Sequence, residues 1–469
     1  MREEPAAISW TPDLSGSSGP IYLALAAAIQ SDIQIGALNP GDRLPTHRAL
    51  AATLGLDLTT VTRAYGEARR RGLIDAAVGR GTFVRDVGRG RRDAEVAPVE
   101  VDLSMNLPPL PAASDIPTLL SRTLATVLRR GDAAQMLNYH PSGGGADDRA
   151  AAVQWLTPLL GDLPPSRALV AAGGQAILTA LLTTLAPAGS VILTEAFTYP
   201  GLRAVAAQLG LTLEGLPLDG QGLIPEALDA ACARFSPTAL YTIPTIQNPT
   251  TATMSPERRD AVATVARRHG LTVIEDDAYG MSPTVPPPPI ATLIPELTWY
   301  IGTVSKSLLP ALRVAYLVAP DERRATRMRA ALRAVSQMAP PLSAAVVARW
   351  IRDGTAHRIL DEIRREAAAR QSLAAAVLPA GTFAAHPQGH HLWLSLPQGW
   401  SATAFATQAR RFGLALVPDS AFAVAPATAP NPAVRLSLGA ARDIDHLAPA
   451  LERIASLMDE DADVPPEIV

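Results

Sequence analysis

One residue type stands out before any motif is considered. Lys306 is the only lysine of the chain, and all 40 other basic residues are arginine. Arginine serves surface ion pairs as well as lysine does, but its guanidinium stays protonated and cannot condense with an aldehyde, whereas a lysine amine can. Uniform arginine usage can also reflect biased coding, so the count alone leaves the question open. The residues around Lys306 decide it.

The surroundings of Lys306 support that chemistry. The apolar run WYIGTVS just before it predicts a strand that would hold the amine at its end. A second strand-like run, LTVIED, ends on Asp276, whose carboxylate could keep the nitrogen of an aromatic ring protonated. The adjacent Asp277 is the rival for that role.

A third group would hold a phosphate. The segment AAGGQAILTALL places Gly173, Gly174, Gln175 and Ala176 where a strand should turn into a helix. The free N–H groups and the dipole of a helix N-terminus attract a phosphate. A glycine pair is weak evidence alone, but EAFTYPG follows with Tyr199, an aromatic side chain that could stack on a ring. Amine, carboxylate and phosphate cradle together predict a site for pyridoxal 5'-phosphate.

The elements that must position these groups follow an α/β pattern. Between Arg167 and about Pro320, helical stretches alternate with strand-like runs, of which the clearest are SVILTE, ALYTIP, LTVIEDD, WYIGTVS and RVAYLVAP. After about Pro341, long helical stretches lead into the runs HLWLSLP and AVRLSLG, which predicts a smaller C-terminal α+β lobe. The proline-rich piece TVPPPPIATLIP predicts a surface loop.

The first hundred residues have a different pattern. Residues 21–35 and two shorter stretches, which Thr46 and Asp57 could cap, predict three helices. The run LIDAAVGRGTFV then alternates like two short strands around residues 78–81. Helix, tight turn, helix and β-wing predict a winged helix-turn-helix.

Charge and composition set limits on partners and location. Residues 19–85 hold eight arginines against five acidic residues in a chain of net charge −3, which indicates a nucleic acid partner. Residues 86–100 are rich in charge, Gly and Pro and predict a mobile linker. No apolar run reaches the ~18 residues of a membrane span, and the acidic N-terminus is unlike a signal peptide. We therefore expect a cytoplasmic protein with no membrane contact.

Residues 20–84 resemble the winged helix-turn-helix of GntR-type bacterial regulators. The stretch GDRLPTHRALAATLGLDLTTVTRAYGEARRRGLIDAAVGRGTFV carries the resemblance. It implies binding to double-stranded DNA, with candidate contacts at Arg43, Arg48, Thr59, Thr60, Arg63 and Arg80. For any one of these arginines, a solvated surface position is an equal alternative. Leu58 departs from the pattern, because many GntR-type sequences carry Arg there.

Residues 101 to about 460 resemble a fold-type I aminotransferase, and the two parts in this order are identified as the MocR family of bacterial transcriptional regulators. The resemblance implies an α/β large domain of the pyridoxal 5'-phosphate-dependent transferase type with the smaller C-terminal α+β lobe. We therefore expect a DNA-binding domain over residues 19–85, a linker over 86–100 and an aminotransferase-like domain over 101–460.

The resemblance also implies roles for residues around the cofactor. The stretch TVSKSLLPALR matches the signature in which the lysine, here Lys306, carries the cofactor as a Schiff base. Arg313 in the same stretch would bind the phosphate, and Ser305 would be a further cofactor-binding residue. Tyr279 and Asn248 match residues that hydrogen-bond the phenolic oxygen, although they could be ordinary turn residues. Lys306, Asp276 and Tyr279 are the groups expected to do chemistry.

Two further matches concern a partner subunit and a ligand. Tyr139 in NYHPSGGG matches the tyrosine that reaches the phosphate of the neighbouring subunit, which implies a homodimer, although a core or loop tyrosine is the alternative. Arg435 in AVRLSLG matches the arginine that clamps a substrate's α-carboxylate with a bidentate fork. An ordinary arginine at a strand end is the alternative there.

Other positions depart from the aminotransferase pattern. Thr251 replaces the glycine that usually follows NPT, and Asn106 stands where a family glycine commonly contacts substrate. Asp148 replaces a leucine beside Arg149. These departures put efficient transamination in doubt.

Three functions remain open: a transcription factor that senses pyridoxal 5'-phosphate or a small amino compound, a working aminotransferase with an accessory DNA module, or a structural relic. A sensor needs only cofactor binding and a ligand-dependent change of shape, whereas an enzyme needs every proton-transfer contact tuned for turnover. We expect the sensor, and the retained cofactor residues argue against a relic. We expect no metal site, because Pro and Gly in HPQGHHLW exclude helical ligand spacing for His386, His390 and His391.

Overall fold

The computed structural model describes the chain in two compact units, residues 1–96 and 97–469. The described residues are 10–12, 20–34, 37–39, 42–71, 73–77, 81–84, 100–110, 114–130, 136–425 and 432–460. Two sequence predictions therefore lie outside them: the DNA contact at Arg80 and nearly all of the linker over 86–100. Among the described residues, no helix is both long and apolar enough to cross a membrane.

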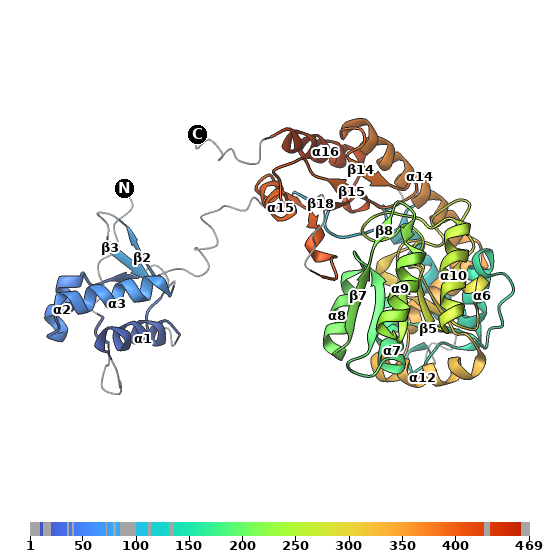
Figure 1. Ribbon diagram of the computed structural model, residues 1–469, viewed down its shortest axis with the longest axis horizontal. Coiled ribbons are helices and arrows are strands. Elements are labelled where there is room, and N and C mark those ends of the chain that lie inside the picture. The colour runs from blue at the N-terminus through green and yellow to red at the C-terminus, as the bar shows by residue number, and fades with distance from the viewer. Residues whose placement is uncertain are drawn as a thin grey trace. The chain divides into compact units, whose positions relative to one another are not determined.

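The N-terminal unit combines three helices with a three-stranded sheet, drawn in blue in Figure 1. The helices are α1 (Ile21–Gln34), α2 (His47–Leu54) and α3 (Leu58–Arg70). The antiparallel strands, in the order β1-β3-β2, are β1 (Arg43–Leu44), β2 (Ile74–Ala77) and β3 (Gly81–Val84). Thr46 and Asp57 cap α2 and α3, because their side-chain oxygens accept the N–H groups of Ala49 and Thr59. The predicted winged helix-turn-helix is confirmed.

Apolar side chains of all three helices hold this unit together. Leu25 and Ile29 of α1, Leu50 of α2 and Val61 of α3 are fully buried in one cluster. The Tyr65 hydroxyl donates to the Pro45 carbonyl at 2.9 Å, which ties α3 to the turn before α2. The exposed faces of α2 and α3 are thereby fixed relative to each other.

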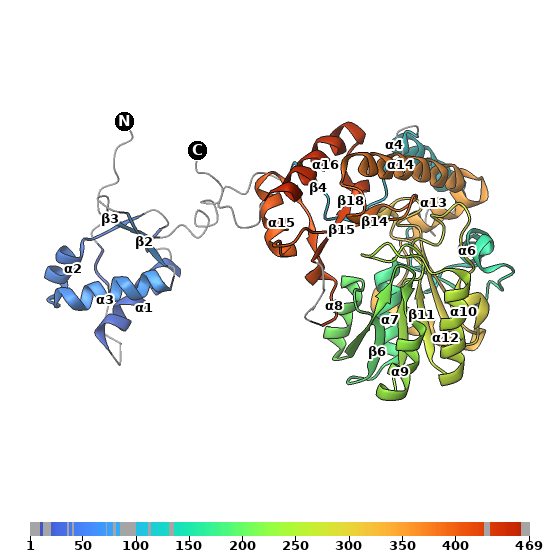
Figure 2. The same cartoon turned by 45° about the horizontal axis from the view of Figure 1, so that its top comes forward.

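A seven-stranded sheet forms the centre of the second unit, with helices on both of its faces (Figure 1 and Figure 2). Its order is β5-β13-β12-β11-β10-β6-β7, and only β13 runs antiparallel to its neighbours. The strands are β5 (Ala168–Ala171), β6 (Val191–Glu195), β7 (Thr212–Leu216), β10 (Ala239–Thr242), β11 (Thr272–Asp276), β12 (Thr298–Thr303) and β13 (Ala315–Val318). All five strand-like runs of the sequence are strands of this sheet.

The two faces of the sheet are covered by different helices. Tyr300 of β12 faces the core that α6 and α13 complete, whereas Trp299 and Ile301 face the core of α7, α8 and α12. This alternation is the period-two pattern of a strand buried on both sides. The covering helices are α4 (Ile116–Arg130), α6 (Ala146–Leu160), α7 (Gly174–Leu185), α8 (Pro200–Leu209), α9 (Pro225–Phe235), α10 (Pro256–His269), α12 (Glu322–Ser336) and α13 (Pro341–Arg352).

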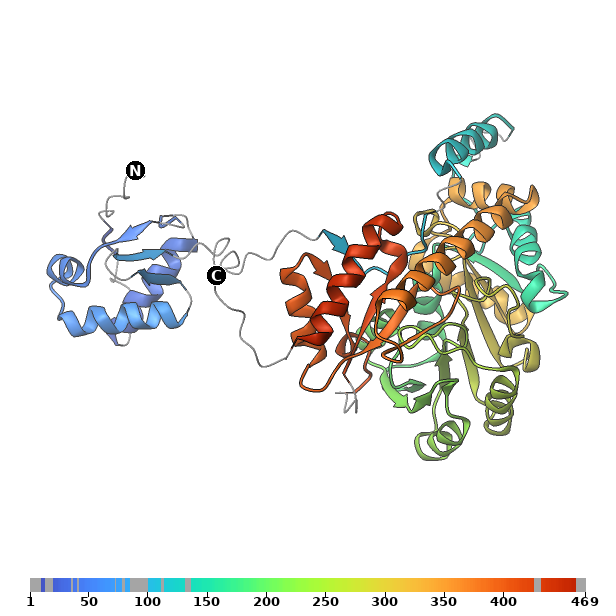
Figure 3. The same ribbon diagram turned by 90° about the horizontal axis from the view of Figure 1, so that it is seen from above.

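The C-terminal lobe is a smaller α+β layer, drawn in orange to red in Figure 3. Its sheet has the order β14-β15-β18-β17, with β14 (Phe383–Ala385), β15 (His391–Ser395), β17 (Val417–Pro418) and β18 (Ala433–Ser437). Its helices are α14 (Thr355–Val377), α15 (Ala402–Arg411) and α16 (Ile444–Asp459). A parallel pair of β4 (Val101–Asp102) and β16 (Leu414–Ala415) joins the start of the domain to this lobe. Two short strands, β8 (Leu218–Asp219) and β9 (Gly222–Leu223), form a hairpin.

The proline-rich piece is only partly the surface loop that its composition predicts. Residues 290–293 form the short helix α11 (Ile290–Leu293), and Ile290 is fully buried. The N–H groups of Ile290 and Ala291 donate to the two carboxylate oxygens of the buried Glu275 at 2.9 and 2.8 Å. A buried acid needs such donors, so the second half of the piece is drawn into the core.

Candidate functional site

Lys306 lies in the connection between β12 and β13, at the carboxyl end of the sheet. Its Nζ donates a hydrogen bond to the backbone carbonyl of Asn106. Burial lowers the pKa of Lys306 from 10.5 to about 8, helped by the positive charge of Arg435 and opposed by the negative charge of Asp276. A large fraction of this amine is therefore neutral near pH 8 and able to attack an aldehyde.

Asp276 ends β11 on the same edge of the sheet. Its Oδ2 accepts a hydrogen bond of 2.6 Å from the hydroxyl of Tyr241 in β10. Burial raises the pKa of Asp276 to about 6, while the Tyr241 bond and the charge of Lys306 act to lower it. The carboxylate is thus mostly ionised at neutral pH, which suits a partner for a protonated ring nitrogen.

The rival carboxylate, Asp277, is occupied elsewhere. Its Oδ2 accepts from the Tyr300 hydroxyl at 2.9 Å, and its charge interacts with Glu275 and the buried Arg259. Tyr300 points to the face of the sheet covered by α6 and α13. The charge of Lys306 acts on Asp276, whereas Asp277 interacts with Arg259 and Tyr300, which favours Asp276 as the partner carboxylate.

The start of α7 has the form of a phosphate cradle. The N-cap Gly173 has a φ of 94° and no side chain to cap the helix. A Cβ at this position would overlap the guanidinium of Arg313, which lies against the glycine. Arg313 Nη2 donates to the Ala172 carbonyl at 3.3 Å, so its charge sits beside the free N–H groups of Gly174, Gln175 and Ala176.

Other side chains near this cradle could also contact the cofactor. Gln175 Nε2 donates to the Gly201 carbonyl at 3.0 Å, whereas its buried Oε1 has no hydrogen-bond partner among the described residues. Ser305 shares a hydrogen bond of 3.0 Å with Thr303 beside Lys306. Tyr199, the N-cap of α8, feels the charges of Asp276, Arg313 and Arg435. Helix N–H groups, a guanidinium and hydroxyls are the donor set that a phosphate takes.

Arg435 enters the site from β18 of the C-terminal lobe. Its Nη1 donates to Asn248 Oδ1 at 2.8 Å, and its Nη2 donates to the backbone carbonyl of Ser104. Its buried Nε has no hydrogen-bond partner among the described residues. Burial lowers the pKa of Arg435 to about 10, so the group stays charged and can receive an anion.

Tyr279 and two histidines close the site on the lobe side. The Tyr279 hydroxyl lies 3.5 Å from His391 Nδ1, and the Lys306 ammonium nitrogen lies 6.0 Å from the centre of the tyrosine ring. His390 stacks edge-on against Tyr279, with ring centres 5.3 Å apart. Burial lowers the pKa of His390 to about 3 and that of His391 well below its usual range. Both imidazoles are neutral, so the positive charge of the site comes from Lys306, Arg313 and Arg435.

Not every predicted residue joins this cluster within one chain. Tyr139 is 79% exposed, unlike the buried residues around Lys306. Three residues that the sequence reasoning did not place here belong to the site, Ser104, Tyr241 and His391, and Asn106 joins them. The sequence marked Asn106 only as a residue at the position of a substrate-contacting family glycine, and it marked His390 and His391 only as excluded metal ligands.

The predicted DNA contacts on the winged unit differ in their exposure and in the bonds that their side chains make. Arg48 on α2 and Arg63 on α3 are exposed, and the Arg63 guanidinium carbon lies 4.2 Å above the ring of Tyr22. The hydroxyl of Thr59 is engaged by the cap, because it donates to Asp57 Oδ1 at 2.5 Å. Thr60 is half-buried on α3, and Arg43 of β1 lies over Gly81 of the wing.

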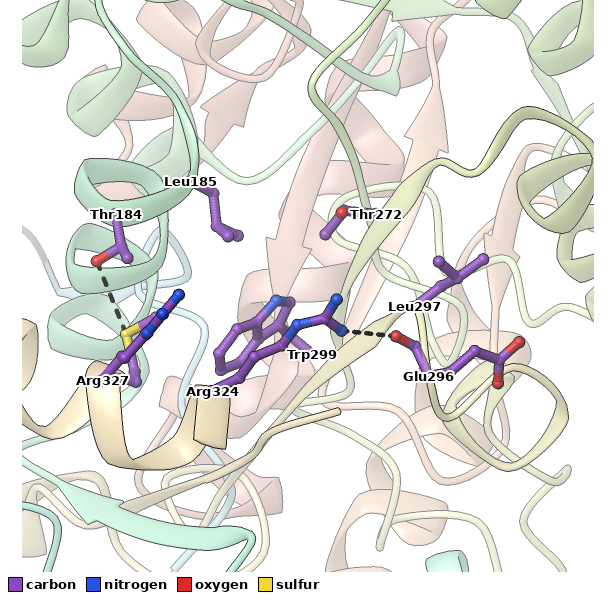
Figure 4. A pocket seen from close by; sticks show the side chains of 9 residues that line it. Thr184, Leu185, Thr272, Glu296, Leu297, Trp299, Arg324 and Arg327 are labelled. Atoms are coloured by element: carbon purple, nitrogen blue, oxygen red, sulfur yellow. Dashed lines mark hydrogen bonds between the residues drawn. The ribbon is translucent and has the colours of Figure 1, made fainter. Parts of the chain in front are cut away.

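A separate cavity of about 250 Å³ opens at the other end of the sheet (Figure 4). Trp299 at the start of β12, Thr184 of α7 and Arg327 of α12 line it. Lys306 and Asp276 are at the opposite strand ends, so this cavity is distinct from the cluster around Lys306.

Comparisons with known proteins identify both parts of the chain. Residues 99–454 match the family model "Aminotransferase class I and II", and residues 21–84 match "Bacterial regulatory proteins, gntR family". The HTH-type transcriptional regulator YdeF of Bacillus subtilis is 30% identical over 97% of each chain. The HTH-type pyridoxine biosynthesis transcriptional regulator PdxR of Corynebacterium glutamicum is 29% identical over 74% of this chain and 77% of its own.

Solved structures agree with the fold. LysN, the α-aminoadipate aminotransferase of Thermus thermophilus, was solved with N-(5'-phosphopyridoxyl)-L-leucine; it is 25% identical with a TM-score of 0.70, covering 84% of this chain and 98% of that one. The kynurenine aminotransferase of Pyrococcus horikoshii shares the fold at 23% identity and a TM-score of 0.70, covering 80% and 94%.

The family implies pyridoxal 5'-phosphate as the cofactor. The amine of Lys306, the carboxylate of Asp276 and the uncapped α7 N-terminus beside Arg313 fit that group. The chain belongs to the aminotransferase class I and II family, and it is a GntR-type transcriptional regulator fused to an aminotransferase domain, the arrangement of the MocR regulators.

Proposed function

We propose that this regulator holds pyridoxal 5'-phosphate on Lys306 and changes its affinity for duplex DNA when the cofactor or a small amino compound occupies that site. The observation that carries the proposal is the convergence of a neutralisable amine, Asp276 and the Arg313 cradle in a chain that begins with a winged helix-turn-helix. A DNA-binding function supports a location in the cytoplasm.

Each polar end of the cofactor has a partner in the chain. Lys306 binds the aldehyde, Asp276 holds the proton of the ring nitrogen, and the cradle of Gly174, Gln175, Ala176, Ser305 and Arg313 binds the phosphate. Tyr279 and Asn248 donate to the phenolic oxygen; Asn248 can do so because Arg435 engages only its Oδ1 and leaves its amide N–H groups available. Tyr199 stacks on the ring. When bound, the cofactor supplies an electrophilic carbon that exchanges amines.

Arg435 selects the effector. Its side chain is 6% exposed and keeps its charge, and its fork can exchange the oxygens of Asn248 and Ser104 for those of a carboxylate. A ligand with both an amine and an acid group can then reach Lys306 and Arg435 together. The effector class is therefore a small amino acid or a similar amino compound.

The winged unit binds DNA through Arg43, Arg48, Thr59, Thr60, Arg63 and Arg80. Arg63 stands on the Tyr22 ring, a support that orders a long side chain before it meets DNA. Exposed arginines on the same unit are suited to phosphates, and residues at the start of α3 are suited to base edges in the major groove.

A homodimer completes the assembly. Tyr139 and Leu137 are 79% and 75% exposed, and Leu110 is 62% exposed. Large apolar side chains at such exposure are typical of a surface that a partner covers. In the dimer, Tyr139 would reach the phosphate of the neighbouring subunit.

The test is an operator titration. DNA selected by the purified protein is titrated with cofactor-free protein, with cofactor, and with cofactor plus a panel of amino acids, while keto acid release is followed in parallel. We expect a ligand-dependent change of affinity of about 5- to 150-fold. Coincident titration curves together with many turnovers of keto acid would replace the sensor by a working aminotransferase.

A further inference from the structure

The first described residues after the segment 85–99 run directly into the cofactor site. Glu100 N–H donates to the Gly413 carbonyl at 2.9 Å, and Leu103 N–H donates to the Ala415 carbonyl at 3.0 Å. The Leu103 carbonyl accepts from Ser437 N–H at 2.9 Å. Up to Leu103, the segment is therefore held by backbone bonds to the C-terminal lobe that involve no group of the cofactor site.

The next residues are held in a different way. The Ser104 carbonyl accepts from Arg435 Nη2, and the Asn106 carbonyl accepts from Lys306 Nζ. Asn106 Nδ2 also lies 3.4 Å from His391 Nδ1. Two of these three contacts use the groups that we assign to the effector carboxylate and to the cofactor aldehyde.

Both binding events therefore compete with the same short segment. A lysine amine bound to an aldehyde carbon no longer has its ammonium protons for the Asn106 carbonyl. In either bidentate geometry of Arg435 a carboxylate takes a proton of Nη2, the nitrogen that donates to the Ser104 carbonyl, so the two acceptors compete for it. Each ligand removes a hydrogen bond from residues 104–106.

The side chain of Asn106 is placed to exchange partners at the same time. His391 Nε2 lies 3.3 Å from the Gln247 carbonyl, which can only accept, so this nitrogen carries the proton and Nδ1 is the acceptor. The single lone pair of Nδ1 is contested by Asn106 Nδ2 at 3.4 Å and the Tyr279 hydroxyl at 3.5 Å. When Tyr279 turns its hydroxyl to the cofactor, His391 Nδ1 becomes free to accept a hydrogen bond from Asn106 Nδ2.

We propose that residues 104–107, here called the reporter segment, convert occupancy of Lys306 and Arg435 into a change at the point where the chain leaves toward the DNA-binding unit. The proposal rests on the proposed function and adds the path from the cofactor site to the connection with residues 1–96. Lys306 and Arg435 release the two carbonyls, Asn106 rebinds through His391, and the backbone between them shifts. Because Glu100 is only four residues before Ser104, the shift is made next to the covalent connection to residues 1–96.

The first test follows backbone hydrogen exchange of the full-length protein, cofactor-free and with pyridoxal 5'-phosphate. We expect the amides of residues 104–107 to exchange faster with the cofactor, because the backbone that carries them is no longer held at the Asn106 carbonyl; a restraint worth one hydrogen bond corresponds to about fivefold. The amides of β5 are the internal control and should not change. Added ligands usually slow exchange around a site, so faster exchange is a specific signature, and unchanged or slower exchange overturns the proposal.

The second test uses a matched pair of variants in operator titrations. Asn106→Ala removes the amide that rebinds His391, and we expect the ratio of operator affinities with and without pyridoxal 5'-phosphate to shrink by about fivefold. Gln408→Ala is the control, because it deletes a side-chain amide on α15 that accepts from Arg411 and is no part of the cofactor site, so its ratio should stay that of the wild type.

The outcomes distinguish a failure of the reporter segment from a failure of the proposed function. A wild-type ratio in Asn106→Ala overturns the reporter segment and leaves the regulator intact. If the operator affinity of the wild type responds to neither cofactor nor amino acids, the proposed function fails, and hydrogen exchange, which needs no variant, still decides whether the segment responds.

Discussion

The Tyr241 hydroxyl donates to Asp276 Oδ2 across 2.6 Å, from one strand of the central sheet to the next. This bond acts against the burial that raises the pKa of Asp276 to about 6. It keeps the carboxylate ionised at the pH at which a ring nitrogen needs it. Tyr241 is itself fully buried, so its hydroxyl has no solvent to turn to.

Tyr241→Phe should therefore weaken cofactor binding at neutral pH. In the wild type, cofactor affinity should fall as the pH drops through about 6, because Asp276 becomes protonated. Without the Tyr241 bond the pKa of Asp276 rises, so the same fall should begin at a higher pH. Equilibrium dialysis over a pH series measures both midpoints. Tyr300→Phe is the matched control, because its hydroxyl serves Asp277; an equal shift in both variants would refute the role of Tyr241.

Attachment of the cofactor should depend on the titration of Lys306. The neutral amine is the nucleophile, and the pKa of Lys306 is lowered to about 8. The initial rate of attachment should rise with pH and level off above about 8, whereas a free lysine derivative levels off only near its usual ~10.4. Stopped-flow absorbance gives the profile. A plateau that coincides with that of the free amine would contradict the burial argument.

Gly173→Ala should cost both stability and cofactor. The new Cβ would overlap the Arg313 guanidinium, and the φ of 94° is one that side chains rarely adopt. We expect a loss of ~1–3 kcal/mol in unfolding free energy from the backbone and, in addition, a weakened phosphate cradle. Gly189→Ala has a similar φ of 85° with nothing within 4 Å, so it should show the stability loss alone. Denaturant unfolding and cofactor dialysis on the same samples separate the two effects.

Thr251→Gly should stabilise the protein. Thr251 is buried at a φ of 65°, the left-handed region that a β-branched residue disfavours. Relief of ~1–3 kcal/mol of strain, less ~0.5–1 kcal/mol for the greater entropy of glycine in the unfolded chain, leaves a net gain of about 1 kcal/mol. Thermal unfolding measures it. Thr251→Ala, which keeps a Cβ at the same φ, should recover less than half of the gain, and an equal gain from Ala would point to packing instead.

Leu58→Arg should tighten DNA binding. Leu58 begins α3 and is 42% exposed, an apolar side chain at the end of the helix that faces DNA in this class of unit. An arginine there adds one phosphate or base contact, which should steepen the slope of log affinity against log salt by about 0.9. Leu58→Gln provides the uncharged control and should leave the slope unchanged. Fluorescence anisotropy over a salt series distinguishes the two.

The fold followed closely from local patterns in the sequence. The runs that became β6, β10, β11, β12 and β13 are short and apolar because these strands are buried on both faces. The caps Thr46 and Asp57 were equally visible, because capping is decided by residues within one turn. The proline-rich piece misled because its second half is ordered by Glu275, fifteen residues away in sequence.

The cofactor site was predictable only where a motif carried it. Lys306, Asp276 and the α7 cradle stand in recognisable local contexts. The position of Asn106 was recognisable, but its contact with Lys306 was not, because that contact is made by a backbone carbonyl across 200 residues and a carbonyl leaves no trace in residue type. His391 meets Asn106 across 285 residues, so only the folded chain brings them together.

The antiparallel strand β13 has one further consequence. Because it returns beside β12, the amine of Lys306 and the guanidinium of Arg313 are carried by a single connection that is clamped at both ends by the β12–β13 ladder. The two groups proposed to hold the aldehyde and the phosphate of the cofactor are therefore kept at a fixed spacing by one connection. Arg435 comes instead from β18 of the C-terminal lobe, so a movement of that lobe would change the distance of Arg435 from Lys306 and Arg313 while the spacing of the latter two stays the same.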